Sequence, residues 1–327
     1  MNMPIYLQCK TGIELFPKAP FNFDATLHKP DHFPSADNAW EPGIRWQTML
    51  WQDEHLGLKF ENGGTLEQPR IALSIWSSDE LDLAYLAHLT SEIQYRYNLN
   101  MDLHTFYRRL EADPQLAPIL HKWRGLKPMS PGSLYEYLII ATVLQNATVR
   151  RSVNMLQSLF EHFGSLLSFD GRALYCYWAP EAMDRVGEQE LRQLRVGYRA
   201  KSIKRVSQAF SRQEIDEQDL RRKSRDEQRK ALLDLYGIGP ASVGYILFDV
   251  FHHLDELEYI SPWEQKIYTT LFFGTPTDAP VEVNRLLNFF EQRFGQDKML
   301  AVHYVWEDLF WKRKNEKIDW LEELIRL

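Results

Sequence analysis

The sequence predicts an α+β fold, with an antiparallel β-rich domain at residues 1–101 followed by an all-helical domain at residues 102–327. Two observations predict it. Between residues 47 and 76, short apolar or alternating runs are broken by Gly, Asn and Pro, as in antiparallel strands joined by turns. From about residue 102 onward, apolar residues instead recur at the spacing of helices that bury one face.

The individual elements follow from the same patterns. We expect strands at residues 47–51, 56–64 and 69–76, with a hairpin at Asn62-Gly63-Gly64, and a helix at residues 79–98. Two helices are expected between Ser133 and Phe163. Further helices are expected at residues 191–209, 226–236, 240–254, 262–273, 280–294 and 298–312.

Composition is typical of an ordered globular protein, with 44% hydrophobic residues and 10 tryptophans. Cys9 and Cys176 alone cannot build a disulfide framework, a cysteine-based zinc site or an iron–sulfur cluster, so no such cofactor is expected. The apolar run at residues 137–144 is too short to span a bilayer, and the N-terminus lacks the apolar segment of a secretion signal. We therefore expect a cytoplasmic protein without a membrane partner, associated with the nucleoid if the source is bacterial.

Charge is unevenly distributed along the chain. The formal net charge is −7, which argues against a protein that coats nucleic acid generally. Residues 199–230 nevertheless contain 11 Lys and Arg against 6 Asp and Glu. This segment could bind phosphate locally, and the alternative is a solvated helical face with mixed charges.

The most informative stretch is the glycine turn in residues 235–247, which leads directly into an apolar helix. Gly237 and Gly239 permit a sharp turn, and Pro240 suits the first position of the helix. The amides at that helix start favour a phosphate. Two helices joined by such a turn form a helix-hairpin-helix, a motif that grips a DNA phosphate. The carbonyls of Gly237 and Gly239 could also bind a structural Na⁺ or K⁺.

Two other polar segments could contact a distorted duplex. Tyr198 and Arg199 follow a glycine, and an aromatic ring can enter a base step while a guanidinium reads an unpaired base edge. The alternative is a tyrosine packed between helices and an ordinary surface arginine. Gln145 and Asn146, with Arg150 nearby, could fill the gap left by an extruded base, or simply end a helix.

These three segments, in this order, resemble the helix-hairpin-helix DNA glycosylases over roughly residues 102–312, most closely the 8-oxoguanine and 3-methyladenine branches. The β-rich start is similar to the N-terminal domain of those branches. The resemblance implies that Tyr198 is the wedge and that Arg199 reads the orphaned partner base. It also implies that Gln145 and Asn146 plug the duplex while Arg150 faces the partner base or its backbone. The implied partner is double-stranded DNA with a damaged base, bound by a monomer.

Two positions of the family pattern are not matched. Ala241 replaces the lysine nucleophile of bifunctional members, so no Schiff base and no lyase activity are expected. Ser261 falls where the family has its catalytic aspartate, and Glu264 is the nearest carboxylate that could stabilise a cationic transition state. Residues 261–264 also form a complete capping box, which gives Glu264 a structural alternative. Asp249, one helix earlier, is a further candidate.

The expected base pocket is aromatic. Tyr304 on the helix at 298–312, and Tyr245 and Phe248 on the helix after the glycine turn, could stack against a flipped base, although core packing is the alternative for Phe248. The glutamine of the 8-oxoguanine branch falls on Leu300 or Val302. Such a pocket suits a stacked or alkylated base better than 8-oxoguanine.

The function implied is a monofunctional DNA glycosylase of base excision repair, which flips a damaged base and hydrolyses its N-glycosidic bond. An alternative is an inactive protein on the same fold that binds damaged DNA, which the missing aspartate and lysine favour. A third is a scaffold for protein interactions that binds no DNA, which the negative net charge favours.

Overall fold

The computed structural model describes residues 3–28, 34–316 and 318–324. The chain forms two units, each assembled from separate stretches of sequence. Unit 1 comprises Met1–Leu103, Arg124–Leu220 and Leu235–Gly237, and unit 2 comprises His104–Trp123, Arg221–Asp234 and Ile238–Leu327. This division differs from the two continuous domains that we expected, because residues 124–220 return to pack with the β-rich part.

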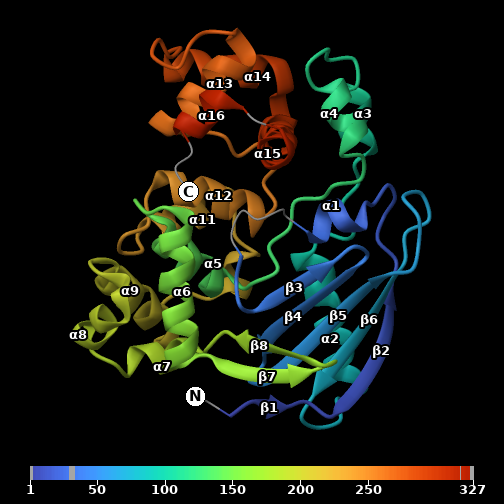
Figure 1. The fold of residues 1–327 in the computed structure, drawn as a ribbon, viewed down its shortest axis with the longest axis vertical. Helices are drawn as coiled ribbons and strands as arrows, with labels where there is room; N and C mark the ends of the chain where they lie inside the picture. Colours follow the sequence, from blue (N-terminus) through green and yellow to red (C-terminus); the bar gives the residue numbers. More distant parts are fainter. Residues whose placement is uncertain (1–2, 29–33, 317, 325–327) are drawn as a thin grey trace. The chain divides into compact units, whose positions relative to one another are not determined.

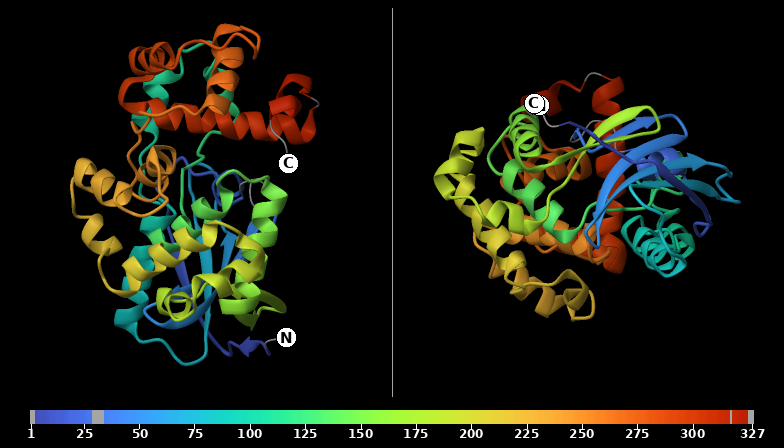
Figure 2. Two further views of the ribbon diagram at one scale, coloured as in Figure 1. Left: turned by 90° about the vertical axis from the view of Figure 1, so that its left-hand side faces the viewer. Right: turned by 90° about the horizontal axis from the view of Figure 1, so that it is seen from below.

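A five-stranded antiparallel sheet forms the centre of unit 1 (Figure 1). Along one strand, Ile71, Leu73 and Ile75 point to a single face, and helix α2 (Leu83–Arg96) packs on that face through Leu89 and Ile93. Figure 2 shows α2 running beside the sheet. The strand order is β2 (Cys9–Leu15), β6 (Ile71–Ser77), β5 (Glu54–Asn62), β4 (Ile44–Trp51) and β3 (Asn38–Glu41). The expected strands and the helix at 79–98 are thus confirmed with shifted ends.

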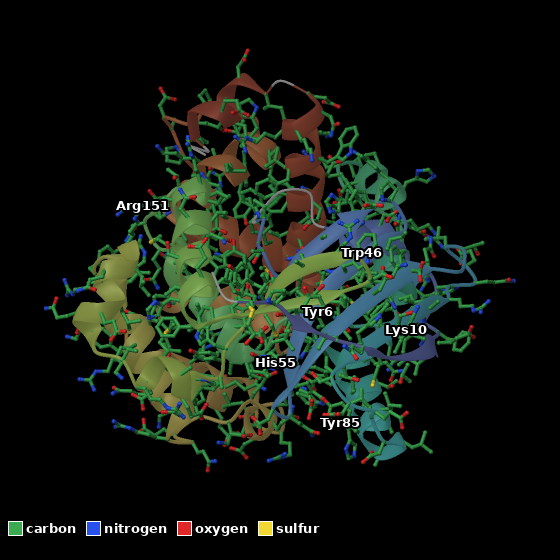
Figure 3. The ribbon with its side chains drawn as sticks, turned by 60° about the horizontal axis from the view of Figure 1, so that its bottom comes forward. Tyr6, Lys10, Trp46, His55, Tyr85 and Arg151 are labelled. Atoms are coloured by element: carbon green, nitrogen blue, oxygen red, sulfur yellow. The ribbon has the colours of Figure 1, made fainter. Side chains whose placement is uncertain are left out.

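A β-hairpin lies within the part that we expected to be all helical, which corrects that expectation. It consists of β7 (Ser165–Phe169) and β8 (Arg172–Cys176), and β7 also pairs in parallel with β1 (Ile5–Tyr6). Asp170 and Gly171 form its turn with φ of 47° and 72°, which an Asp-Gly sequence favours. The hairpin packs with Trp46 in a second core of unit 1, and Figure 3 shows Trp46 and Tyr6 beside it.

The remaining helices of unit 1 include the two expected between Ser133 and Phe163, which are confirmed. Both begin at a capping side chain, Ser133 for α5 and Thr148 for α6. The short break between them contains Gln145 and Asn146. Besides α2, the helices of unit 1 are α1 (Phe23–Leu27), α5 (Leu134–Leu144), α6 (Val149–Phe163), α7 (Pro180–Asp184), α8 (Glu188–Leu191), α9 (Arg199–Ser211) and α10 (Glu217–Leu220), with a π-helical turn at Arg192–Val196.

Unit 2 is helical throughout its described residues. Its longest helix, α15 (Lys298–Asn315), is buried on nearly all sides as far as Leu309, and Trp306 donates to the hydroxyl of Tyr268 at 2.8 Å. Figures 1 and 2 show α13 and α14 gathered with α15. The other helices are α3 (His104–Leu110), α4 (Ala117–Lys122), α11 (Arg225–Leu233), α12 (Pro240–Asp249), α13 (Pro262–Phe273), α14 (Val283–Phe294) and α16 (Asp319–Leu324), with a 3₁₀ turn at Gly295–Asp297.

Across both units, the helices of the described residues lack the combination of length and apolar character needed to cross a bilayer.

Candidate functional site

The glycine turn joins helices α11 and α12. Gly237 has φ of +85°, and a Cβ there would clash with the side chain of Ser202, so both conformation and space require glycine. Gly239 is extended and precedes Pro240, the first residue of α12. Among the residues that the structure describes, no side chain caps α12, whereas Ser224 caps α11 through a capping box. The first amides of α12 therefore remain available to an anion.

Four of the predicted contact residues meet in unit 1. Tyr198 is 57% exposed, and its hydroxyl lies 3.4 Å from Nδ2 of Asn146 and 3.5 Å from the carbonyl oxygen of Gln145. Nε2 of Gln145 donates to the carbonyl of Gly237 at 2.8 Å. The wedge and plug candidates are thus linked to the first glycine of the turn. The exposed ring of Tyr198 differs from the packed tyrosine that was the structural alternative.

Arg199 does not lie where an exposed base reader would lie. It is only 1% exposed, and its guanidinium donates to the carbonyl of Gln145. The guanidinium carbon also lies 4.7 Å from the centroid of the Tyr198 ring. Arg199 therefore contacts Tyr198 and Gln145, the candidates for the wedge and the plug, and its assignment as the reader of the orphaned base finds no support in this geometry.

A group of exposed cations accompanies these residues in unit 1. Arg150 lies at the start of α6, and no ion pair forms to it among the residues that the structure describes. Figure 3 labels its neighbour Arg151. Nζ of Lys201 lies 4.7 Å from the ring centroid of Tyr236, which is 49% exposed and which the sequence analysis did not single out. Within the described residues 145–151 and 195–205, the exposed cations without an ion pair are Arg150, Arg151, Arg195, Lys201 and Arg205.

The later part of the basic segment at 199–230 behaves differently. In unit 2, Arg225 pairs with Asp255 at 2.7 Å, and Arg229 pairs with Glu256 at 2.6 Å. These two arginines are neutralised locally. The mixed-charge alternative therefore describes the unit 2 part better than the unit 1 part.

Unit 2 contains a pocket directly after the glycine turn. Its empty space is about 300 Å³, counting the part that is open to solvent. Ala241 and Gly244 on α12 are small and leave room at its wall, and Tyr245 stands beside them. The lining residues are Pro240, Ala241, Gly244, Tyr245, Glu256, Leu257, Glu258, Tyr259, Glu264 and Met299. The position that would hold a lysine nucleophile and the nearest candidate carboxylate thus line the same pocket.

Glu264 is 5% exposed and makes several hydrogen bonds. One carboxylate oxygen accepts from the amide of Ser261 at 2.8 Å, while the Ser261 hydroxyl accepts from the Glu264 amide at 3.3 Å. The capping box that was the structural alternative is therefore formed. The other carboxylate oxygen accepts from the hydroxyl of Tyr245. Burial, followed by the charge of Glu264, raises the pKa of the adjacent Tyr268 well above its usual range.

A second buried carboxylate, Glu256, was missed from the sequence. Both of its oxygens accept from Arg229, at 2.6 and 2.7 Å, and Arg229 also lies 2.9 Å from Glu258. Burial raises the pKa of Glu256, and Arg229 opposes that shift. The loop between α12 and α13 has no helical or strand period, so no local pattern indicates that Glu256 lines a pocket.

Two of the three expected pocket aromatics lie elsewhere, which corrects the prediction. Phe248 is 1% exposed and packs against the ring of His303, with centroids 5.2 Å apart. Tyr304 is fully buried, and its hydroxyl lies 2.8 Å from that of Tyr107. Both face the core of unit 2, because α15 carries Tyr304 and His303 and is buried on nearly all sides between Met299 and Leu309. Tyr245 lines the pocket, and Asp249 is not among the lining residues.

The two carbonyls considered for a monovalent cation each accept a hydrogen bond. Gly237 accepts from Gln145, and Gly239 accepts from the amide of Val243 at 3.0 Å. Each oxygen retains a second lone pair, so a cation site there stays a prediction. Among the described residues, no group of three or more His, Cys, Asp or Glu side chains could hold a metal ion.

This fold is shared with DNA glycosylases of known structure. The 3-methyladenine DNA glycosylase of Archaeoglobus fulgidus aligns with a TM-score of 0.72 at 14% identity, over 91% of this chain and 99% of that one. The 8-oxoguanine glycosylase/lyase of Clostridium acetobutylicum, bound to duplex DNA with cytosine opposite 8-oxoguanine, aligns at 0.66 and 15% identity, over 94% and 99%.

Sequence relatives belong to the same class. The chain is 26% identical over 208 residues to the "Probable N-glycosylase/DNA lyase" of Methanothermobacter thermautotrophicus, covering 57% of this chain and 65% of that protein. It is 22% identical over 152 residues to the DNA-3-methyladenine glycosylase of Bacillus subtilis, covering 46% and 50%. The matched region spans less than two thirds of either relative, and no protein-family model matches the sequence. These relatives and structural neighbours are named as an N-glycosylase/DNA lyase and as 3-methyladenine and 8-oxoguanine glycosylases, in agreement with the resemblance to helix-hairpin-helix DNA glycosylases noted in the sequence.

Proposed function

We propose that this protein is a DNA glycosylase of base excision repair that hydrolyses the N-glycosidic bond of a damaged base. Unit 1 would bind the duplex through Tyr198, the Gln145–Asn146 turn and its exposed cations. The flipped base would enter the pocket of unit 2 lined by Tyr245 and Glu264. The observation that carries the proposal is that Ala241, Tyr245 and Glu264 line one pocket at the start of the helix that follows the glycine turn.

Glu264 has the chemistry that hydrolysis needs. As the base leaves with the bonding electrons, positive charge develops on the sugar, and a fixed carboxylate lowers the energy of that state. The hydrogen bonds from Ser261 and Tyr245 hold the Glu264 carboxylate in place before substrate arrives. Such preorganisation avoids the cost of orienting the group during the reaction.

We further propose that the enzyme has no lyase activity. A lyase of this kind needs an amine that attacks the sugar carbon and forms a Schiff base. Ala241 offers no amine, and no lysine is among the residues that line the pocket. The archaeal relative is named as a DNA lyase, so this chain would differ from it in that step.

The pocket favours an alkylated base over an oxidised one. Tyr245 and Tyr259 offer aromatic faces, and Glu264 contributes negative charge nearby. An electron-poor, alkylated purine that carries positive charge gains from both features. Its positive charge also weakens the glycosidic bond, so a single carboxylate can suffice for hydrolysis.

A second candidate function is recognition of damaged DNA without chemistry. The observation that favours it is that both oxygens of Glu264 already accept hydrogen bonds, one of them within a capping box. Glu264 could therefore be retained for capping α13 in a protein that binds damaged DNA without excising a base.

The two candidates are separated by an excision assay. Duplexes carrying alkylated, oxidised or deaminated bases are incubated with the protein, and abasic sites are converted to strand breaks with hot alkali. We expect breaks from alkylated duplexes only after alkali, and no covalent adduct with borohydride. Glu264→Gln should abolish the breaks, while the control Glu282→Gln, which removes a charge at an exposed residue of unit 2 outside the pocket lining, should keep the activity within a few-fold of the wild type. Binding without breaks would select the second candidate, and breaks or an adduct formed without alkali would refute the absence of lyase activity.

A further inference from the structure

Arg199 is a buried charged side chain, which is uncommon in proteins unless an opposite charge pairs with it. It is 1% exposed, yet no carboxylate pairs with it among the described residues, and its Nε has no hydrogen-bond partner. A buried charge without a counter-charge is costly. Its contacts are the carbonyl of Gln145 and the face of the Tyr198 ring. Both of these residues belong to the proposed DNA-binding face of unit 1.

The carbonyl oxygen of Gln145 contacts two side chains of this face. It accepts from Arg199 and lies 3.5 Å from the hydroxyl of Tyr198. The next residue, Asn146, has φ of +48° and reaches the same hydroxyl with its amide. The side chain of Gln145 donates to Gly237 on its other side. One guanidinium therefore contacts both the turn that would plug the duplex and the ring that would wedge it open.

We propose that Arg199 is a positioning residue that holds Tyr198 and the Gln145–Asn146 turn in the conformation that enters the duplex, and that it does not read the orphaned base. The proposal rests on the function proposed above, because it assigns a task within the same DNA-binding face. Its physical basis is preorganisation. A wedge and a plug that are already in place lose less conformational entropy when DNA binds.

The two roles of Arg199 differ in what they predict about the partner base. A guanidinium that reads a base edge discriminates among bases by about 5- to 150-fold in affinity per good contact. A positioning residue instead contributes equally, whichever base stands opposite the lesion. It also governs insertion of the wedge, which is a separate event from attraction to the phosphates.

The experiment uses the full chain and duplexes with a tetrahydrofuran abasic-site analogue opposite each of the four bases. 2-Aminopurine next to the analogue brightens when a wedge unstacks it, so its fluorescence reports insertion. The wild type should bind these duplexes more tightly than intact DNA and brighten the probe. If it does neither, the proposed function is overturned together with this inference.

Arg199→Met should weaken binding about tenfold, by a similar factor opposite all four bases, because a charge-assisted hydrogen bond is removed. It should also abolish the brightening at saturating protein. Arg199→Lys can still donate to the Gln145 carbonyl and should restore most of both signals. Arg185→Met removes an exposed charge of unit 1 outside these contacts and should leave the brightening intact.

Two results would overturn the positioning role while leaving the proposed function standing. One is a decrease in affinity confined to a single partner base, which would make Arg199 a reader. The other is undiminished brightening in Arg199→Met. If circular dichroism shows that Arg199→Met does not fold, Arg199→Lys decides alone. A small decrease that is equal across the four bases supports the proposal, and a decrease that depends on the partner base refutes it.

Discussion

The two tasks of Glu264, capping α13 and supplying a carboxylate to the pocket, can be separated by two substitutions. Glu264→Gln removes the charge but keeps the shape. A glutamine oxygen can still accept from the amide of Ser261, and its NH₂ can donate to the hydroxyl of Tyr245, which then accepts. Ser261→Ala does the reverse, because it removes the capping hydroxyl and leaves the carboxylate in the pocket.

The expected magnitudes are opposite for the two variants. Removing the N-cap in Ser261→Ala should lower the free energy of unfolding by about 1 kcal/mol, with excision within a few-fold of the wild type. Glu264→Gln should keep both hydrogen bonds and so cost less than about 1 kcal/mol in stability. Removing one electrostatic stabiliser of a charged transition state costs about 10²–10³ in rate, so excision by Glu264→Gln should fall by that factor.

Urea denaturation and single-turnover excision on the same preparations test these magnitudes. Single-turnover conditions exclude product release, so the rate reports the hydrolytic step. The reasoning is refuted if Glu264→Gln keeps more than about a tenth of the wild-type rate. It is also refuted if Glu264→Gln and Ser261→Ala lose excision rate in the same proportion to the stability that each loses. In either case Glu264 is a capping residue and another group supports hydrolysis.

Three further predictions concern the turn, the charged face and the buried lysine. Gly237→Ala should lower the free energy of unfolding by about 1–3 kcal/mol in urea denaturation, because residue 237 has a positive φ and a Cβ there would clash with Ser202. Gly239→Ala should lower it by less than about 1 kcal/mol, because a Cβ at residue 239 meets open space. Equal losses of stability in the two variants would contradict this prediction. Replacing both Lys201 and Arg205 by Ala should lower the slope of log Kd against log salt concentration by about 1 for each phosphate that the variant no longer neutralises. Fluorescence anisotropy of labelled duplexes measures this slope, and an unchanged slope would exclude α9 from the DNA interface. Burial lowers the pKa of Lys127 to about 7, so the unfolded state binds the extra proton between pH 7 and 10 and stability should rise with pH in that window. Compared with Lys127→Met, the wild type should gain about 3–4 kcal/mol in unfolding free energy between pH 7 and pH 10, and parallel pH profiles would show that the amine stays charged when buried.

Local patterns predicted most of the secondary structure. The strands between residues 44 and 77 and the helix pair between 133 and 163 follow from apolar spacing and capping residues, which act over a few neighbouring residues. The β7–β8 hairpin was missed even though its Asp170-Gly171 turn is a strong hairpin signal. Its short alternating strands lie just after a long helix, and the helical period of the surrounding sequence hid them.

The candidate site was predicted in part. Tyr198, Gln145 and Asn146 come together as expected, and Tyr245 and Glu264 line one pocket. Phe248 and Tyr304 were misplaced, because an aromatic residue on an apolar helix has the same local pattern whether it faces a pocket or the core. Which face is covered depends on helices that pack from elsewhere in the chain.

The sequence by itself determined the glycine turn, the capping box at Ser261 and the absence of a lysine at residue 241, because each depends on adjacent residues or on a single side chain. Only the tertiary structure decided that Arg199 is buried against Gln145 and that Glu256 lines the pocket. Gln145 and its partner Gly237 lie 92 residues apart, and Arg199 lies 54 residues from Gln145. No local period encodes such contacts, since they exist only once the intervening helices have packed.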